Sequence, residues 1–296
     1  MRSSSAPLMV PVLALACLGL AACTNDVVAT ADANSSSTHA LLVVEQTVPV
    51  DTEDATRSHA SMWFMRVSDD QAVEAVTGLV TDLIEVPGFG QCVTTGAHAA
   101  QSIPASMVPV ELAFAGEVSV RTGTSLVPLS VRAFPDVANL VSGVMYTAPG
   151  QSDLALPLGG SLEVRTSGTD GLAAMDASTQ APSPPKSVRI EGLPFDSSEV
   201  EAHAGQALNL SWIAGEPSDR IYVDIDPIPG SPSDRVRCAM PDTGSGRIAA
   251  VAIPETPALT LSIHRMRVSP LRTSAGEIGT AHFDVAVVGK VKVAAP

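Results

Sequence analysis

Every second residue is apolar over most of this chain, and that alternation limits what the chain can fold into more than any other feature. From residue 40 onward, Val, Leu, Ile and Thr alternate with other residues in short runs that end at clusters of Gly, Pro, Asp and Ser. Side chains of a β-strand point alternately to its two faces, so a period of two is typical of strands with one buried face. The sequence therefore predicts an all-β protein, in which only residues 69–80 are suited to a helical turn or two.

The predicted strands are runs whose apolar residues share one face. They are Val110-Leu112-Phe114, Val118-Val120, Val127-Leu129-Val131, Leu162-Val164, Val188-Ile190, Leu208-Leu210-Trp212, Ile221-Val223-Ile225, Val236-Cys238-Met240, Leu259-Leu261-Ile263 and Phe283-Val285-Val287. The rings of Phe114, Trp212 and Phe283 fall on the apolar phase and are expected in the core. The chain has only two Trp, two Tyr and six Phe, so few rings remain for an exposed stacking platform. In the adjacent pair Trp63 and Phe64, one ring should face outward, where a neighbouring loop is expected to cover it.

A segment rich in proline divides this pattern into two parts. The run ASTQAPSPPK begins at Ala177, and its prolines and small polar residues are typical of a domain boundary. The sequence predicts two β-sandwich domains of immunoglobulin-like or related form, residues 40–176 and 186–296, joined by a linker over residues 177–185.

The N-terminus has the features of a bacterial lipoprotein signal peptide over residues 1–22. Arg2 precedes an apolar stretch that is too short to span a membrane, and the run Leu20-Ala21-Ala22-Cys23 closes it. The thiol of Cys23 is the predicted lipid attachment site, and two or more acyl chains would give a stable anchor. Thr24 stands where Asp would favour retention in the inner membrane, so the outer membrane is the expected location. The alternative is an ordinary secretory signal cut near Ala22, with Cys23 as a spare thiol.

The segment after the signal peptide and the overall charge indicate an acidic body on a flexible link. Residues 23–39 are small and polar, and about 16 such residues have a root-mean-square reach of roughly 20 to 24 Å. The formal net charge is −14, and cleavage after Ala22 would remove Arg2 and no acid, which gives −15. So acidic a chain is not suited to binding nucleic acid or an anionic lipid surface. The expected partners are the membrane, through the N-terminal lipid, and an envelope protein or glycan.

Cys17 lies in the predicted signal peptide and Cys23 is the predicted lipid attachment site, so two other cysteines remain. Cys92 follows a turn-like run and Cys238 falls on an apolar phase, so an exported protein is expected to join them in a disulfide bond. Closing so long a loop would stabilise the fold by about 5 kcal/mol on the chain-entropy model. Two buried free thiols are the alternative.

Two further local patterns make specific predictions. A hairpin around residues 227–234 would place Asp224 opposite Arg237 and Asp226 opposite Arg235, which favours cross-strand ion pairs over a calcium site. The apolar phase of residues 259–268 shifts by one residue after Ile263, which predicts a β-bulge at residues 264–265 with solvated His and Arg side chains.

Motifs of enzymes are absent from the sequence. It contains no G-x-S-x-G, H-E-x-x-H, P-loop or G-x-G-x-x-G motif, and its six histidines show no metal-ligand spacing. The sequence therefore predicts no catalytic residue, no metal site and no cofactor. A Ser-His-Asp site assembled from distant strands remains a remote alternative, since triads are defined by geometry.

Four segments of the chain resemble segments of a known group of proteins. The lipoprotein signal, LNLSWIAGEPSDRIYVDID from Leu208, VRCAMPDTGSG from Val236 and LSIHRMRVSP from Leu261 resemble uncharacterised bacterial lipoproteins of β-sandwich type. The resemblance implies fold and location, and it implies no activity. Together with the residues, it predicts an exported, membrane-anchored, non-enzymatic protein with a binding, surface or envelope-assembly role. The alternatives are a small-ligand or glycan-binding envelope module and, more remotely, a hydrolase.

Overall fold

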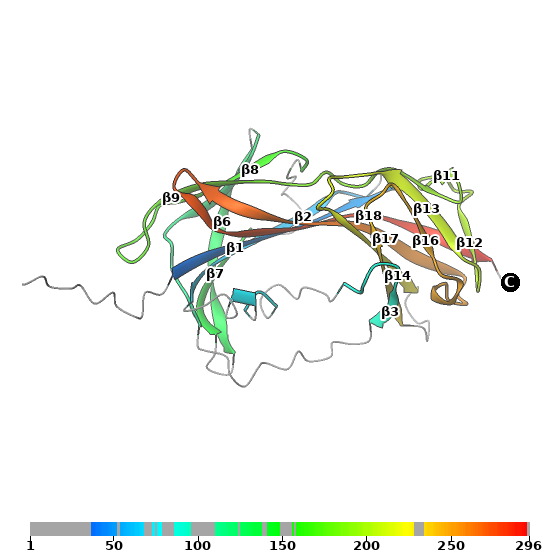
Figure 1. Ribbon diagram of the computed structural model, residues 1–296, viewed down its shortest axis with the longest axis horizontal. Coiled ribbons are helices and arrows are strands. Elements are labelled where there is room, and N and C mark those ends of the chain that lie inside the picture. The colour runs from blue at the N-terminus through cyan, green and yellow to red at the C-terminus, as the bar shows by residue number, and fades with distance from the viewer. Residues whose placement is uncertain are drawn as a thin grey trace, which may run out of the picture. The chain divides into compact units, whose positions relative to one another are not determined.

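The computed structural model confirms an all-β fold of sandwich type (Figure 1). It describes residues 37–51, 54–67, 73–74, 76–78, 86–95, 110–123, 125–137, 141–148, 156, 158–227 and 234–294, with backbone only for residues 95 and 135–137. Val73, Glu74 and residues 76–78 are helical, within the segment where the sequence allowed a helical turn. No helix of the described residues is long and apolar enough to cross a membrane.

Strands make up nearly all the regular structure. The first nine are β1 (Ser37–Pro49), β2 (Arg57–Val67), β3 (Cys92–Thr95), β4 (Val110–Leu112), β5 (Val118–Thr122), β6 (Ser125–Val137), β7 (Val141–Thr147), β8 (Ser161–Thr166) and β9 (Met175–Gln180). The others are β10 (Lys186–Ile190), β11 (Leu193–Pro194), β12 (Glu201–His203), β13 (Leu208–Ile213), β14 (Arg220–Pro227), β15 (Arg235–Pro241), β16 (Ser245–Ile248), β17 (Ala258–Thr273) and β18 (Gly276–Ala294), with the short 3₁₀ helix η1 (Ala250–Ala252) before β17.

The strands form two sheets. In the large sheet the order is β12-β18-β1-β2-β4-β7-β6-β5-β8-β9-β17-β14-β15-β3, and β18 also pairs with β17 and β2 with β7. These extra pairings close a circuit that runs β18-β1-β2-β7-β6-β5-β8-β9-β17 and back to β18, which we call the ring. The small sheet has the order β11-β10-β13-β16. β1 pairs with β18 in parallel and with β2 in antiparallel orientation.

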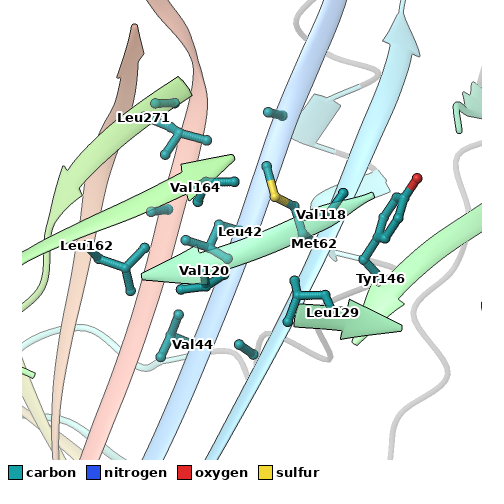
Figure 2. Packing of buried hydrophobic residues seen from close by; sticks show 14 of the residues in the cluster. Leu42, Val44, Met62, Val118, Val120, Leu129, Tyr146, Leu162, Val164 and Leu271 are labelled. Carbon is teal, nitrogen blue, oxygen red and sulfur yellow. The ribbon is translucent and has the colours of Figure 1, made fainter. Parts of the chain in front are cut away.

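The ring encloses one apolar cluster, which we call the ring cluster. It contains Leu42 and Val44 of β1, Val120 of β5, Leu162 of β8 and, from the far end of the sequence, Leu271 of β17. Figure 2 shows these side chains pointing toward one another from their separate strands. Alternate residues of each strand supply them, as the period of two predicted.

The outer face of β1 and β2 is also covered. Trp63 packs there with Leu41, Met65 and Val76, while Phe64 points into the ring cluster, and both rings are almost fully buried. Val76 belongs to the helical segment that follows β2. One of the two adjacent rings therefore faces outward and is covered, as predicted, but the covering residue Val76 is helical and does not lie in a loop.

The second half of the chain forms a sandwich around another apolar cluster, the sandwich cluster. Ile190 and Leu210 come from the small sheet, and Val223, Ile263 and Val291 come from the large one. Two facing sheets with interdigitating inner faces are the packing expected of a sandwich.

The division into two separate domains is not confirmed. Ser36–Pro296 form one compact unit, and β1, β17 and β18 each contribute to both clusters. The expected linker is partly strand, because β9 extends to Gln180 and pairs with β8. The expected flexible segment is likewise shorter than predicted, because β1 begins at Ser37 and includes His39. The signal peptide, Cys23 and the rest of that segment lie outside the described residues.

Candidate functional site

A groove of about 1010 Å³ runs over β5 and β6 to the β4–β5 connection and is the candidate functional site. Its apolar lining comes from the β4–β5 connection, β5, β6 and β7, and consists of Phe114, Val118, Leu126, Leu129, Val131 and Tyr146. Phe114 is 51% exposed, Leu126 56% and Val131 48%. Val118, Leu129 and Tyr146 also belong to the ring cluster, so the groove continues the core out to the surface.

Phe114 is held in its exposed position by the backbone on either side of it. The amide of Ala113 donates to the carbonyl of Phe64 at 2.7 Å, and the amide of Ala115 donates to the Tyr146 hydroxyl at 2.8 Å. The same hydroxyl donates to the carbonyl of Gly116 at 3.1 Å. Because the chain is fixed at both neighbours, the Phe114 ring is presented on a rigid support.

Gly116 makes this turn possible. Its φ is +79°, a region that L residues rarely adopt, and a Cβ there would lie 2.2 Å from Ser167 Oγ and 2.5 Å from the carbonyl oxygen of Gly168. The turn therefore requires glycine for both its conformation and its close packing.

Tyr146 connects the groove to the core. Its ring stacks on Phe114 with centroids 6.3 Å apart and meets Phe64 edge-on at 5.9 Å. Burial raises the pKa of the Tyr146 hydroxyl, and the hydrogen bond from Ala115 partly opposes that rise. The hydroxyl therefore keeps its proton at neutral pH and can act as the donor to Gly116.

Charged residues border the groove on its β8 side. Arg165 Nε lies 3.2 Å from Asp176 and its Nη2 lies 3.6 Å from Glu163, which also approaches Arg121 at 3.8 Å. All four side chains are at least 39% exposed, so these pairs contribute little to stability and their groups can turn toward a ligand. The groove thus combines an apolar floor with a polar border.

A second polar cluster lies on the face of the large sheet that points away from the sandwich cluster, and we call it the Tyr222 network. The Tyr222 hydroxyl donates to Asp284 Oδ2 at 2.5 Å, and His264 Nδ1 lies 2.9 Å from Asp284 Oδ1. Arg237 donates twice to Asp224, at 2.7 Å each. The Tyr222 ring is within 4.3 Å of both the imidazole of His264 and the guanidinium of Arg237. Cross-strand register brings these groups together, since Tyr222 pairs with His264 and Asp224 with Arg237.

Electrostatics fix the protonation of several groups in this network. Burial and the nearby Asp284 raise the pKa of Tyr222 well above its ordinary value, so it remains a donor. Burial alone would raise the pKa of Asp284, but the charge and hydrogen bond of His264 and the hydrogen bond of Tyr222 outweigh it and lower that pKa. Burial opposes the charge of Arg237, yet its bond to Asp224 leaves the guanidinium pKa raised.

The imidazole of His264 is oriented by a carboxylate on one side only. Its Nε2 is buried and has no hydrogen-bond partner, lying 4.0 Å from Asp224 Oδ2. In a Ser-His-Asp site a hydroxyl occupies that position, and no hydroxyl is bonded to this nitrogen. Across the part of the chain that the structure describes, no three His, Cys, Asp or Glu side chains are arranged to hold a metal.

The predicted bulge at His264 and Arg265 is wrong. β17 keeps an unbroken register with β18 through this point and shifts only at Leu271 and Arg272. The apolar phase changes because the core-facing position 265 holds arginine, whose side chain is 2% exposed. Arg265 donates to Asp242 at 2.7 Å, to the carbonyl of Ile213 at 2.7 Å and to that of Ser183 at 2.9 Å.

This buried arginine is the centre of what we call the polar junction, which separates the ring and sandwich clusters. Arg267 donates to both oxygens of Asp219, at 2.5 and 2.8 Å, and Trp212 Nε1 donates to Asp242 at 2.5 Å. The side chains of Asp219 and Asp242 are at most 1% exposed. Buried charges paired in this way position the elements that carry them, and here they fasten residues 181–185 and the small sheet to β17.

Other sequence predictions can be placed directly. Cys92 and Cys238 form a disulfide bond, and they are direct cross-strand partners of β3 and β15. The ion pairs Asp224–Arg237 and Asp226–Arg235 are confirmed. Cys23 lies outside the described residues, so its lipidation stays a prediction.

The groove was not predicted from the sequence. Phe114 was expected in the core with Trp212 and Phe283, and only the last two are buried. β4 ends at Leu112, so alternation no longer decides where Phe114 points. The signal that was available is Gly116, two residues later, which marks a turn.

Comparisons with known proteins give no family for this chain. No family model matches it, and no curated protein matches it. One solved structure is described as "Ca2+-stabilized adhesin helps an Antarctic bacterium reach out and bind ice"; it is 11% identical over 88% of this chain, with a TM-score of 0.23, and this chain covers half of its length. Another is the Fcho1 Mu homology domain of Danio rerio with bound Eps15 peptide, which is 10% identical over 89% of this chain and 99% of that one, with a TM-score of 0.26. Similarity this low carries no functional argument.

Proposed function

We propose that this protein is an exported lipoprotein of the bacterial cell envelope, anchored in the outer membrane through Cys23, that binds an envelope partner non-enzymatically through this groove. The observation that carries the proposal is the group of exposed apolar side chains, Phe114, Leu126 and Val131, in one groove. Contiguous exposed apolar surface is typical of binding sites, because leaving it in water is unfavourable.

The rigidity of the groove supports a binding role. Phe114 is fixed by hydrogen bonds on both sides and stacks on Tyr146, so little side-chain freedom would be lost when a partner covers it. Aromatic residues in such supported positions are common at the centres of interfaces. The exposed Arg165 and Glu163 at the border are suited to the polar rim that surrounds such a centre.

A second candidate function is the binding of a small ligand or glycan in the same groove. The exposed Phe114 ring favours it, because sugars stack on aromatic faces and polar residues beside a ring fix their orientation. Ser119, Glu117 and Arg165 line the groove near that ring. The two candidates share one site and differ in whether the occupant is a macromolecule.

The test is site-specific photo-cross-linking in the native envelope. A photoreactive residue is placed at Leu126, and in a matched protein at Val268, which is 53% exposed on β17 and does not line the groove. We expect a discrete adduct from position 126, none from position 268, and loss of the adduct when Phe114→Ser is added. Equal labelling from both positions would contradict the proposal.

A second arm separates the candidates and tests the anchor. The Cys23→Ala form should leave the membrane fraction while remaining folded, and its adduct should disappear if the partner is reached only from the membrane. Glycan-dependent thermal stabilisation that Phe114→Ser abolishes, without any protein adduct, would favour the second candidate. Substrate turnover abolished by a single Ser or His substitution would instead support the hydrolase alternative.

A further inference from the structure

β3 is a four-residue strand at the edge of the large sheet, and of its described side chains Cys92 packs against the sandwich cluster. Val93 is 40% exposed, Thr94 is exposed and Cys92 is half-buried. The preceding turn presents Phe89, which is 57% exposed, beneath the guanidinium of Arg220. Apolar burial therefore contributes little to keeping β3 in place.

Two kinds of contact hold β3 on the sheet. It pairs with β15 over four residues, and the connection continues through the amide of Ala239 to the carbonyl of Gln91 at 3.0 Å and the amide of Gly90 to the carbonyl of Ala239 at 2.8 Å. The other contact is the covalent bond between Cys92 and Cys238. A pair of exposed strands is marginal in water when hydrogen bonds alone join them, so the disulfide is the main restraint on β3.

β15 does not depend on β3 for its own position. Its opposite edge pairs with β14 over six residues, and Cys238 and Met240 are buried in the sandwich cluster. Arg237 is bonded twice to Asp224 of β14. If β3 left, β15 would stay in the sheet with its outer backbone groups open.

Arg237 gives independent evidence that the edge of β15 can bind a side chain that β3 does not supply. The residue is fully buried, yet its Nη1 has no hydrogen-bond acceptor. Directly across from it in β3 is Val93, whose side chain has no acceptor atom. A buried guanidinium nitrogen without an acceptor is unfavourable, and a strand with an acceptor side chain at this register would relieve it.

We propose that the Cys92–Cys238 bond is a thiol-operated clamp, and that its reduction releases β3 and opens the edge of β15 to an extended partner strand that carries an amide or hydroxyl side chain opposite Arg237. Addition of a strand to an open edge gives affinity through main-chain hydrogen bonds and specificity through alternate side chains. The clamp is independent of the groove.

The chemistry is an ordinary exchange with a dithiol. A thiolate of the dithiol attacks Sγ of Cys92, the more accessible of the two sulfurs, and the electron pair of the broken S–S bond leaves on Sγ of Cys238, which takes up a proton. The second thiol of the dithiol then attacks the dithiol's other sulfur, which is bonded to Cys92 in the mixed disulfide, and Cys92 leaves as a thiol. Two electrons pass to the protein, and the dithiol becomes a disulfide.

Hydrogen exchange on the mature full chain tests the release. Alternate residues of an antiparallel strand bond to opposite neighbours, so the amides of Arg237 and Ala239 face β3, whereas those of Val236 and Cys238 face β14. After reduction with dithiothreitol, confirmed by alkylation of two thiols, we expect Arg237 and Ala239 to exchange at least tenfold faster while Val236 and Cys238 stay protected. A Cys92→Ser variant should behave in the same way without reductant.

Two results would overturn the clamp. Unchanged exchange at Arg237 and Ala239 in the reduced protein would show that β3 stays bound without the disulfide. Loss of protection throughout the chain, including Val120 of the ring cluster, would show that the bond supports the whole fold.

Binding of synthetic peptides tests the open edge. One probe has the sequence of residues 90–95 with Ser in place of Cys92, and the other also has Gln in place of Val93. We expect both to bind reduced protein and not oxidised protein, and the Gln peptide to bind about fivefold more tightly through the added acceptor. Failure of both peptides to bind reduced protein, or equal affinity of the two, would overturn the proposed partner chemistry.

Discussion

The ring cluster and the sandwich cluster are similar in composition and differ in how they are closed. The sandwich cluster lies between two sheets, and the polar junction fastens its small sheet to β17 through Arg265 and Asp242. The ring cluster is enclosed by a single sheet that bends around it, and at one end its apolar surface continues to Phe114 in the groove. Closure by a second sheet covers the inner faces of both sheets, whereas closure by bending leaves the ends to be covered separately.

This difference assigns different roles to the two ends. In the polar junction the charged groups are buried and paired, and both clusters bury apolar side chains. Three exposed apolar side chains, Phe114, Leu126 and Val131, line the groove. Substitutions in the polar junction and in the two clusters should therefore affect stability, and substitutions in the groove should affect binding.

The largest expected effect is at the centre of the polar junction. Arg265→Met removes the ion-pair partner of Asp242 and leaves an uncompensated carboxylate whose side chain is 1% exposed, which should cost roughly 3–5 kcal/mol of unfolding free energy. Chemical denaturation of the purified protein measures it. Arg272→Met is the matched control, since its pair with Glu277 is exposed and contributes about 0–1 kcal/mol. Equal effects of the two substitutions would show that the junction does not hold the clusters together.

A truncation inside the ring cluster should come next. Leu162→Ala removes a fully buried side chain that faces Val120 and Leu42 in Figure 2, and we expect a loss of about 2–5 kcal/mol in the same denaturation measurement. Leu126→Ala, on the exposed surface of the groove, should change stability by less than about 0.5 kcal/mol. If the two variants were equally stable, the boundary drawn between core and groove would be wrong.

The pH dependence of stability should reflect His282, a half-buried histidine on the outer face of the ring. Burial, with the nearby His39, lowers the pKa of His282 below 6.5 in the folded state. The unfolded chain then binds the proton more readily, so stability is complete above pH 6.5 and falls as the pH drops toward the folded pKa. His282→Gln should make this fall shallower in a series of thermal melts from pH 7.5 to 5. His203→Gln, on exposed β12, is the control, and an unchanged slope in the His282 variant would refute the assignment.

The smallest effect on stability should accompany the largest effect on binding. Leu126→Glu places a charge in the groove at a residue that is 56% exposed, so unfolding free energy should change by no more than about 0.5 kcal/mol. Binding of the cross-linked partner should be lost, because a charge in an apolar contact must be desolvated. Val251→Glu, at a residue that is 91% exposed on η1 away from the groove, should leave affinity unchanged. Calorimetric titration of both variants with the isolated partner measures the difference.

Much of the fold could be predicted because the alternation of apolar with other residues is a local signal for strands. Each strand that the apolar runs predicted is present, and the Asp224–Arg237 pair followed from one hairpin and its register. The ring could not be predicted in this way, since β1 pairs in parallel with β18 more than 200 residues later and no local pattern encodes that contact. The prolines near residue 182 indicated a boundary, and the chain does pass there from β9 of the large sheet to β10 of the small sheet. Residues of β1, β17 and β18 nevertheless contribute to both apolar clusters, which no local pattern could show.

The candidate site was harder to predict than the fold, for two physical reasons. Arg265 occupies a core-facing position, and a polar residue there has the same effect on the sequence pattern as a bulge. Phe114 follows the end of β4, and its exposure is determined by the turn at Gly116 and by the hydroxyl of Tyr146, 32 residues away in sequence. Both positions depend on contacts between segments that are distant in the chain.

A partner that covers the groove in the envelope should protect its exposed apolar side chains from labelling. Carbene footprinting of the protein in intact envelopes and in purified form measures this at the level of single side chains. We predict that Phe114, Leu126 and Val131 are labelled in the purified protein and protected in the envelope, while Val251 and Val268 are labelled equally in both. Equal labelling of the groove in both preparations, or protection at Val251 and Val268 instead, would contradict the account.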